Sequence, residues 1–311
     1  MKFSVTILGS SSASPTTNRF QTAHAVNIRE RFFLIDCGES TQIQIMRNNI
    51  SFSKINHIFI THTHGDHIFG LFGLLSTMNL DNRRHELHIY GCSLLEKILN
   101  DFLKYFGNEL KYEIFFHSVN VRHNKIIYED NCMTVETIPL KHRVPCCGYL
   151  FKEKMPQQLN IRKEMIERYN LTIVEIVKIK NGYDLICEDG TVISSNELTY
   201  LPYQPRSYAF CSDTEYSKKI IDIVKNVDLL YHEATFAADM QKTAKKTGHS
   251  TTIQAAETAK QANVKKLIIG HFSSRYKDLQ PLLDEALSIF PDTMLAKENE
   301  VFEIEIEKKL P

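Results

Sequence analysis

The chain has 311 residues, which is enough for one large domain or two domains of ordinary size. Its 37 basic and 37 acidic residues cancel, so any polyanionic partner would have to be bound by a local patch. The longest apolar run, residues 68–75, is far shorter than the ~18 residues of a membrane-spanning helix, which excludes a helical membrane protein.

The cysteine content and the first residues indicate a cytoplasmic protein. Seven cysteines, an odd number without C-x-x-C pairs, fit a reducing cytosol better than a disulfide framework. Residues 1–9 carry one positive charge but no apolar stretch long enough for a signal peptide, and they are typical of a first β-strand. Cys146 and Cys147 follow His142 closely, and we interpret them as buried small apolar residues.

Strands and helices alternate along the chain. In residues 1–150 we expect mainly strands, one of them at 32–36, with helices near 41–47, 67–80 and 92–106. In the final third we expect strands at 229–231 and 266–269 and helices at 251–261 and 279–289, with Ser250 and Asp278 as their N-caps. This alternation predicts a layered α/β fold.

A cluster of polar residues between positions 62 and 67 is the strongest indication of chemistry in the chain. Its members are His62, His64, Asp66 and His67. Gly65 allows a sharp turn between them, a strand-like run at 55–60 precedes them, and the helix-like run at 68–75 follows. Imidazole and carboxylate are preferred ligands of Zn²⁺ and similar borderline metals. We therefore predict a metal site on a strand-to-helix loop rather than a polar loop with chance histidines.

Three further polar residues each follow an apolar strand. They are His142, Asp213 and His271. A strand end holds a side chain rigidly at one edge of a sheet, although a single histidine there is often structural. Together with the cluster at 62–67 they make seven ligands, which are enough for two metal ions that share one carboxylate.

The order of these residues resembles the metallo-β-lactamase superfamily, and further motifs resemble one of its families, ribonuclease Z. Residues 33–42 resemble the LxDCGEGTQ segment of that family, and residues 232–236 match its HEAT motif. Residues 249–251 match its HST motif, and residues 271–276 match its HFSSRY motif. The resemblance extends over nearly the whole chain, and the last three motifs are specific to ribonuclease Z.

The resemblance implies the fold and the metal ligands. The expected fold is an αββα sandwich, with two mixed β-sheets face to face, helices outside, and two Zn²⁺ ions at one edge. The first zinc would be bound by His62, His64 and His142. The second would be bound by Asp66, His67 and His271, and Asp213 would bridge both.

The resemblance also implies the reaction, which is endonucleolytic removal of the 3′ trailer from precursor tRNA, leaving a 3′-hydroxyl on the tRNA. Two adjacent zinc ions can lower the pKa of a bound water and stabilise negative charge on a phosphodiester. Asp66 would orient the water, His249 would protonate the leaving ribose oxygen, and Glu233 would orient His249. Arg275 would contact a substrate phosphate.

A tRNA-binding arm is expected at residues 152–182, inserted within a single domain of residues 1–311. This segment has seven Lys or Arg against four Glu, and such a basic segment suits phosphate contacts. The family's usual Gly-Pro-rich tip is absent, and residues 170–177 stand in its place. We expect a helix at 157–169 and short strands at 183–201. Because the family acts as a homodimer, the resemblance also implies two chains.

The sequence leaves two other functions open. A small-substrate phosphodiesterase or related hydrolase of the same fold would keep the seven ligands but would not need Arg275 or the basic segment. An RNA-binding module without turnover is disfavoured because His249, Glu233 and every metal ligand are present. The remaining histidines match no motif, and we expect surface or packing positions for His24, His57, His85, His88, His117 and His123.

Overall fold

The computed structural model describes residues 1–107, 110–156 and 158–307 and divides the chain into two compact units. The larger unit comprises residues 1–128, 135–151 and 207–304. The smaller unit comprises residues 129–134, 152–206 and 305–307. All seven predicted metal ligands belong to the larger unit, so that unit positions the site.

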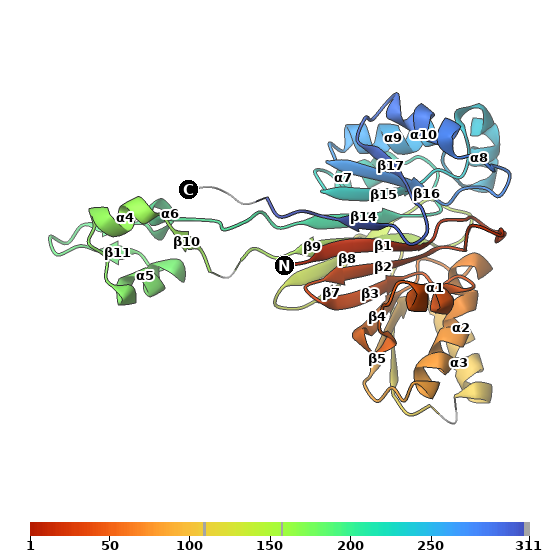
Figure 1. The fold of residues 1–311 in the computed structure, drawn as a ribbon, viewed down its shortest axis with the longest axis horizontal. Coiled ribbons are helices and arrows are strands. Elements are labelled where there is room, and N and C mark those ends of the chain that lie inside the picture. The colour runs from red at the N-terminus through yellow and green to blue at the C-terminus, as the bar shows by residue number, and fades with distance from the viewer. Residues whose placement is uncertain (108–109, 157, 308–311) are drawn as a thin grey trace. The chain divides into compact units, whose positions relative to one another are not determined.

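The first of two seven-stranded sheets has the order β18-β1-β2-β3-β4-β5-β6 (Figure 1). Its strands are β1 (Phe3–Gly9), β2 (Ala23–Ile28), β3 (Arg31–Ile35), β4 (Ile55–Phe59), β5 (Leu87–Gly91), β6 (Ile114–Ser118) and β18 (Val301–Glu303). The strands from β18 to β3 pair antiparallel, and those from β3 to β6 pair in parallel. The parallel half therefore brings the carboxyl ends of its strands to one edge.

The second seven-stranded sheet has the order β17-β16-β15-β14-β9-β8-β7. Its strands are β7 (Ile126–Glu129), β8 (Met133–Pro139), β9 (Cys147–Glu153), β14 (Ser207–Cys211), β15 (Leu229–Glu233), β16 (Lys266–Gly270) and β17 (Thr293–Leu295). The strands from β14 to β17 pair in parallel. β14, β15 and β16 are almost wholly buried and mainly apolar, as expected of parallel strands covered on both faces.

Helices cover the outer face of each sheet (Figure 1). The helices are α1 (Thr41–Arg47), α2 (Gly65–Leu80), α3 (Ser93–Phe106), α7 (Lys218–Ile223), α8 (Gln241–Thr247), α9 (Thr252–Gln261) and α10 (Gln280–Leu287), with short 3-10 helices at Phe52–Lys54 and Ala238–Met240. Leu71 of α2 and Leu95 of α3 pack in one core cluster with Ile58 of the first sheet. Ala255 of α9 packs in another with Leu230 of the second sheet.

Aromatic rings fill the space between the two sheets. Phe33 and Phe59 of the first sheet pack against Phe151 of the second, with ring centroids 5.8 and 5.6 Å apart. His24 is fully buried there, and its Nδ1 lies 2.9 Å from the hydroxyl of Tyr208. Burial lowers the pKa of His24 to about 3, so its ring is neutral and serves as a packing residue.

The histidines outside the motifs occupy the expected surface or packing positions. His57 stacks on His88 across β4 and β5, with ring centroids 4.9 Å apart, and the Nδ1 of His88 lies 2.9 Å from the Nε2 of His117 on β6. His85 and His123 are exposed. All seven cysteines are free thiols, and Cys146 and Cys147 are buried.

The predicted sandwich of two mixed sheets with helices on the outside is confirmed. One boundary near the site is different from the prediction. The helix expected from residue 67 begins at Gly65, so Asp66 and His67 lie in the first turn of α2 and not on a loop. An acidic residue in the first turn is favoured by the helix dipole, which explains the earlier start.

Both N-cap predictions are wrong. Thr251 caps α9, because its side chain accepts a hydrogen bond from the amide of Gln254 and the Gln254 side chain bonds back. The Ser250 hydroxyl instead donates to the carbonyl of Thr214. At α10 the N-cap is Leu279. Asp278 lies one residue earlier, and its side chain accepts a hydrogen bond from the amide of Gln280, the first residue of the helix.

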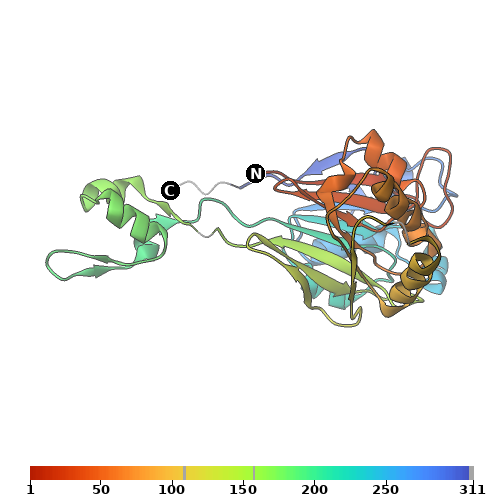
Figure 2. The same cartoon turned by 90° about the horizontal axis from the view of Figure 1, so that it is seen from below.

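The smaller unit has a core of its own, formed by Leu171, Ile179, Leu185 and Leu198. Figure 2 shows the helices and strands of this unit in green. Its elements are β10 (Asn160–Ile161), α4 (Lys163–Arg168), α5 (Ile173–Lys180), β11 (Leu185–Ile186), β12 (Val192–Ile193), α6 (Ser195–Leu198) and β13 (Thr199–Tyr200). The helix expected at 157–169 is shorter than predicted, because β10 occupies its beginning. The short strands expected at 183–201 are present, with α6 between them.

Candidate metal centre

The predicted ligands follow the ends of strands in both sheets. His62 and His64 lie after β4, and Asp213 and His271 follow β14 and β16. His142 follows β8. Asp213 and His271 have positive φ values of 38° and 59°, which non-glycine residues rarely adopt. Such strain is tolerated where the surrounding structure holds a side chain in place, and it is typical of functional sites.

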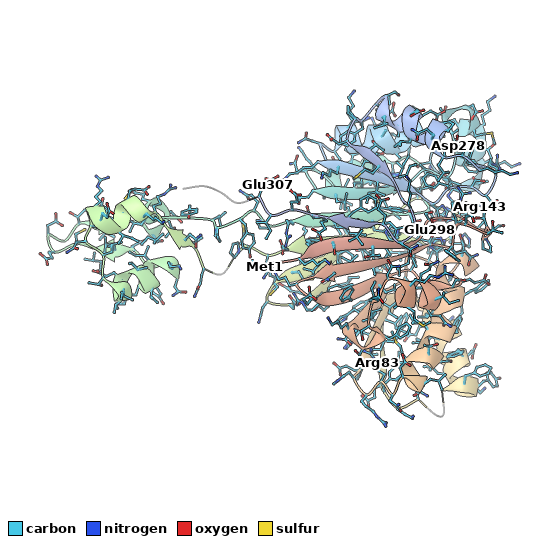
Figure 3. All side chains as sticks on the ribbon, viewed as in Figure 1. Met1, Arg83, Arg143, Asp278, Glu298 and Glu307 are labelled. Carbon is cyan, nitrogen blue, oxygen red and sulfur yellow. The ribbon has the colours of Figure 1, made fainter. Side chains whose placement is uncertain are left out.

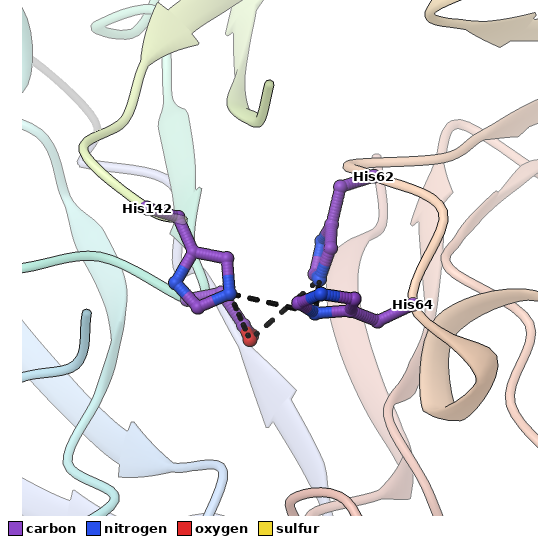
Figure 4. Close-up of side chains that lie close together, drawn as sticks. His62, His64 and His142 are labelled. Atoms are coloured by element: carbon purple, nitrogen blue, oxygen red, sulfur yellow. Dashed lines mark hydrogen bonds and ion pairs between the residues drawn. The ribbon is translucent and has the colours of Figure 1, made fainter. Parts of the chain in front are cut away.

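The first group of ligand atoms comes from His62, His64, His142 and Asp213, and all lie within 4.8 Å of one another. The Nδ1 of His64 is 2.9 Å from the Nε2 of His62 and 3.4 Å from that of His142 (Figure 4). The Oδ2 of Asp213 is 3.7 and 3.6 Å from the same two Nε2 atoms. Three imidazoles and one carboxylate thus converge on one point.

The second group comes from Asp66, His67 and His271. The Oδ2 of Asp66 is 3.6 Å from the Nε2 of each histidine. The Oδ1 of Asp213 is 3.2 Å from His67 Nε2 and 3.1 Å from His271 Nε2. Asp213 therefore directs one carboxylate oxygen at each group, which is the geometry of a bridging ligand.

Hydrogen bonds on the far side of the His142 and His67 rings select their tautomers. The Nδ1 of His142 donates to the carbonyl of Gly248 at 2.7 Å, and the Nδ1 of His67 lies 2.7 Å from Asp36. In the neutral form of both rings this leaves the lone pair on Nε2, directed at the cluster. This is the usual support for a metal-binding histidine.

Two threonine hydroxyls act in the same way. Thr235 donates its single hydroxyl proton to Glu233 at 2.6 Å, so it accepts from the Nδ1 of His271 at 2.9 Å. Thr61 donates to Asp36 at 2.9 Å and accepts from the Nδ1 of His62 at 3.0 Å.

These residues fit a pair of metal ions. The Nε2 atoms of His67 and His271 are buried without a hydrogen-bond partner among the described residues. A buried imidazole nitrogen left so is costly unless something else binds it. Five imidazoles and two carboxylates are a donor set that suits borderline divalent cations.

The electrostatics of the rings agree with this role. Burial, together with the nearby His67, lowers the pKa of His62 well below its ordinary value, and burial lowers the pKa of His142. Although burial opposes it, the carboxylates of Asp213 and Asp36 raise the pKa of His67 well above its ordinary value. The centre therefore attracts positive charge, and a bound metal cation would displace the proton of His67.

His249 and Glu233 adjoin the metal ligands. The Nδ1 of His249 lies 2.8 Å from the Oε1 of Glu233, which is fully buried and also accepts from the amide of Thr214 at 2.8 Å. Burial lowers the pKa of His249, but the Glu233 carboxylate outweighs it and raises that pKa to about 9. His249 is consequently a protonated imidazole at neutral pH.

The local sequence explains how His249 is presented. Gly248 ends α8 in the left-handed conformation, with φ +78°, and Thr251 caps α9 three residues later. His249 lies on this short link, where both helices hold the backbone. A side chain on Gly248 would also approach the Nδ1 of His142 to 3.0 Å, so this position favours glycine twice.

The centre opens into a cavity of about 800 Å³. It is lined by Ser12, Ala13, Gln21, His64, Gly65, Asp66, Phe69, His142, Arg143, Val144, Asp213, Thr235, Phe236, Thr247, His249, His271 and Ser273. Arg143, which is labelled in Figure 3, is an exposed residue of this lining. Arg275 is exposed and does not line the cavity itself; its guanidinium lies 5.0 Å from the ring of Phe236, and its Nε donates to Ser273.

Proteins named ribonuclease Z are similar to this chain over nearly its whole length. Ribonuclease Z of Bacteroides fragilis (strain YCH46) is 48% identical to this chain over 298 residues, covering 96% of this chain and 98% of the relative. Ribonuclease Z of Cytophaga hutchinsonii is 44% identical and covers 97% and 96%. This chain belongs to the ribonuclease Z family. Because its relatives are ribonucleases matched over nearly their whole length, the protein is an endoribonuclease of the hydrolase class.

Solved structures and a family model extend the comparison. The crystal structure of human tRNase Z, short form (ELAC1), is 25% identical, with a TM-score of 0.71 and coverage of 97% of this chain and 100% of that one. The metallo-β-lactamase fold protein YhfI of Bacillus subtilis, at 19% identity and a TM-score of 0.68, shows the same fold. The family model for the anti-Pycsar protein Apyc1 matches residues 3–177. The expected family and the metallo-β-lactamase fold are confirmed.

Sequence reasoning missed the residues that support the ligands. Asp36 is fully buried and accepts hydrogen bonds from Thr61 and His67. The amide of Ala13 donates to Asp66 Oδ2 at 2.7 Å. Asp36 ends an apolar strand, as the predicted ligands do, so that pattern could have identified it. Thr235 lies inside the HEAT motif but carries no charge that would have drawn attention to it.

Within residues 1–107, 110–156 and 158–307, no helix has both the length and the apolar character needed to cross a membrane.

Proposed function

We propose that this edge of the sandwich hydrolyses the phosphodiester that joins a tRNA to its 3′ trailer, leaving a 3′-hydroxyl on the tRNA. The protein is an endoribonuclease of tRNA 3′ processing. One observation carries the proposal. Each of the two carboxylate oxygens of Asp213 faces one of the two groups of candidate ligands, and the protonated His249 lies beside them. A pair of cations next to a proton donor suits displacement at phosphorus.

The donor set supports two Zn²⁺ ions per chain. His62, His64 and His142 would hold one ion, Asp66, His67 and His271 the other, and Asp213 would bind both. When bound, such ions lower the pKa of water and neutralise charge on the scissile phosphate.

The chain's own residues supply the remaining steps. The side chain of Asp66 borders the cavity and is held by the amide of Ala13, so we assign to it the orientation of the attacking water. The Nδ1 of His249 donates a hydrogen bond to Glu233, which leaves Nε2 free to protonate the departing ribose oxygen. Glu233 keeps that imidazole charged and aimed. Arg275, stacked on Phe236 at the rim, would contact a substrate phosphate.

The finer features rest on the family resemblance. Residues 152–182 lie in the smaller unit, and we propose that they form the arm that contacts tRNA away from the cleavage site. We also propose that two chains act as a homodimer, which light scattering coupled to size-exclusion chromatography measures directly. Cytoplasmic location is expected for an enzyme of tRNA maturation, and seven free cysteines agree with it.

The test combines cleavage mapping with a variant of the proton donor. Purified protein should cut labelled precursor tRNA at the trailer junction and leave a 3′-hydroxyl. His249→Ala should retain its metal but cleave roughly two to four orders of magnitude more slowly, the usual loss when a general acid is removed. The loss should shrink for a substrate whose leaving group is p-nitrophenolate, because that group needs no proton. Equal losses on both substrates would assign His249 a structural role.

The same experiment separates the main alternative. A small-substrate phosphodiesterase would hydrolyse bis(p-nitrophenyl) phosphate but would leave precursor tRNA intact. Such a result would overturn the assignment of the substrate while retaining that of the metal centre.

A further inference from the structure

Phe69 is an apolar ring left open to solvent beside the metal centre. It lies in the second turn of α2, lines the cavity, and is 60% exposed. Phe236, which also lines the cavity, is only 5% exposed. A single exposed apolar side chain is common on a protein surface. What distinguishes Phe69 is its place in the wall of the cavity into which the metal centre opens, where a substrate would cover it.

The position of the ring is set by Gly65. A Cβ atom on Gly65 would lie 2.2 Å from Cε2 of Phe69, so the ring rests directly over the Cα of this glycine. Helical side chains lean toward the N-terminus of their helix, which brings Phe69 back over the turn that holds Asp66. Gly65 does not have a positive φ, so its backbone conformation does not require glycine. Glycine is required because the Phe69 ring occupies the space that a Cβ atom would fill.

The helix that carries Phe69 is rigidly anchored. Its neighbours Ile68 and Leu71 are buried in the core beneath the first sheet, so the ring is presented on a fixed surface. Gly65 separates His64 from Asp66 in the chain, and those two residues belong to the two different ligand groups. Phe69 therefore lies beside the place where a scissile phosphate would be held between the metals.

We propose that Phe69 is a substrate-binding residue on which the base of a nucleotide adjoining the scissile phosphate stacks. This rests on the proposed function of the metal centre. Only one ribose separates a base from its phosphate, so a phosphate held between the two ligand groups brings an adjoining base to the cavity wall. Every base has a π face, so stacking on a phenyl ring accepts substrates whose sequences differ at the cleavage site.

The test is a cycle between the ring and the base. Single-turnover cleavage of precursor tRNA is measured for wild type, Phe69→Ala, Phe69→Leu and Phe69→Trp, recording the half-saturating concentration and the maximal rate separately. The same measurements use substrates in which the nucleotide on one or the other side of the scissile phosphate is abasic. Metal content is measured for every protein. Phe106→Ala is the matched control, because Phe106 on α3 is 71% exposed and does not line the cavity.

Phe69→Ala and Phe69→Leu should lose about tenfold in half-saturation or rate on intact substrate, whereas Phe69→Trp and Phe106→Ala should match wild type. One of the abasic substrates should cost wild type a similar factor, and on it Phe69→Ala should lose nothing more. Full activity of Phe69→Ala or Phe69→Leu, or an equal loss of Phe69→Ala on intact and both abasic substrates, would overturn the proposal. Failure of wild type to cut precursor tRNA would instead refute the proposed function.

Discussion

Replacing Glu233 with glutamine should move the pH dependence of cleavage while leaving the shape of the site intact. The Glu233 carboxylate lies 2.8 Å from the Nδ1 of His249 and raises the pKa of that ring from 6.5 to about 9. As the proposed proton donor, His249 must be protonated for cleavage, so the rate should fall as the pH rises through this pKa. In Glu233→Gln the charge is gone, and the pKa of His249 should return toward its ordinary value.

The size of the effect follows from the two pKa values. With a pKa of about 9, roughly nine tenths of the His249 rings are protonated near pH 8; with a pKa of about 6.5, only about 3% are. Glu233→Gln should therefore cleave about 30-fold more slowly than wild type near pH 8, and at almost the same rate near pH 6. Bound cations would lower both pKa values alike, so the predicted quantity is the separation of the two alkaline limbs, about two and a half pH units.

The assay is single-turnover cleavage of precursor tRNA from about pH 5.5 to 10, with metal content and thermal unfolding measured on the same preparations. Glutamine keeps an oxygen that can accept from the amide of Thr214 or from Thr235, so we expect the fold to survive. If the alkaline limb of Glu233→Gln coincided with that of wild type, His249 would not be the proton donor. An equal loss at every pH would likewise contradict the argument, because it would indicate a structural role.

Three further predictions concern the metals and the substrate. Asp213→Ala should bind fewer than two metal equivalents per chain by elemental analysis, because Asp213 faces both ligand groups; two full equivalents would contradict the bridge. Asp36→Asn should weaken metal binding by about 10- to 100-fold in competition with a chromogenic chelator, since it removes the charged partner of a ligand ring; unchanged affinity would show that this support is dispensable. Glutamine at three cationic positions of the smaller unit should flatten the salt dependence of tRNA binding by up to ~0.9 per residue, with hydrolysis of bis(p-nitrophenyl) phosphate unchanged; the positions are Lys163, Arg168 and Lys178. An unaltered slope would remove these residues from the tRNA contact.

The convergence of the candidate ligands could be predicted from sequence, because His142, Asp213 and His271 each follow a strand. His271 follows β16 and Asp213 follows β14, and neighbouring parallel strands end at the same edge. The order of such residues along the chain, together with the HEAT, HST and HFSSRY motifs, indicates both the fold and the family. The start of α2 was harder to place, because Gly65 is a poor helix former and Asp66 reads equally well as a loop residue.

Other features depend on contacts that no local pattern records. Serine is a favoured N-cap residue, but the Ser250 hydroxyl donates its hydrogen bond to the carbonyl of Thr214, which is 36 positions away. The helix expected at 157–169 is shortened because Asn160 and Ile161 pair with Tyr200 and Thr199. Such pairings between distant residues override local helical spacing, and they become visible only in the folded chain.

Two threonine hydroxyls connect the buried carboxylates of the centre to its candidate ligand histidines through hydrogen bonds of defined direction. Thr61 and Thr235 each have one hydroxyl proton, and each gives it to a carboxylate, Asp36 or Glu233. Each hydroxyl can then only accept from an imidazole, which keeps the lone pair of that ring on the nitrogen facing the metals. If either carboxylate became protonated, its threonine could turn its proton toward the ring and remove that constraint. The two buried carboxylates therefore hold these rings in the tautomer that would bind a metal, although neither carboxylate belongs to the two ligand groups. Glu233 contacts the proposed proton donor His249 directly and reaches His271 of the second group through the hydroxyl of Thr235.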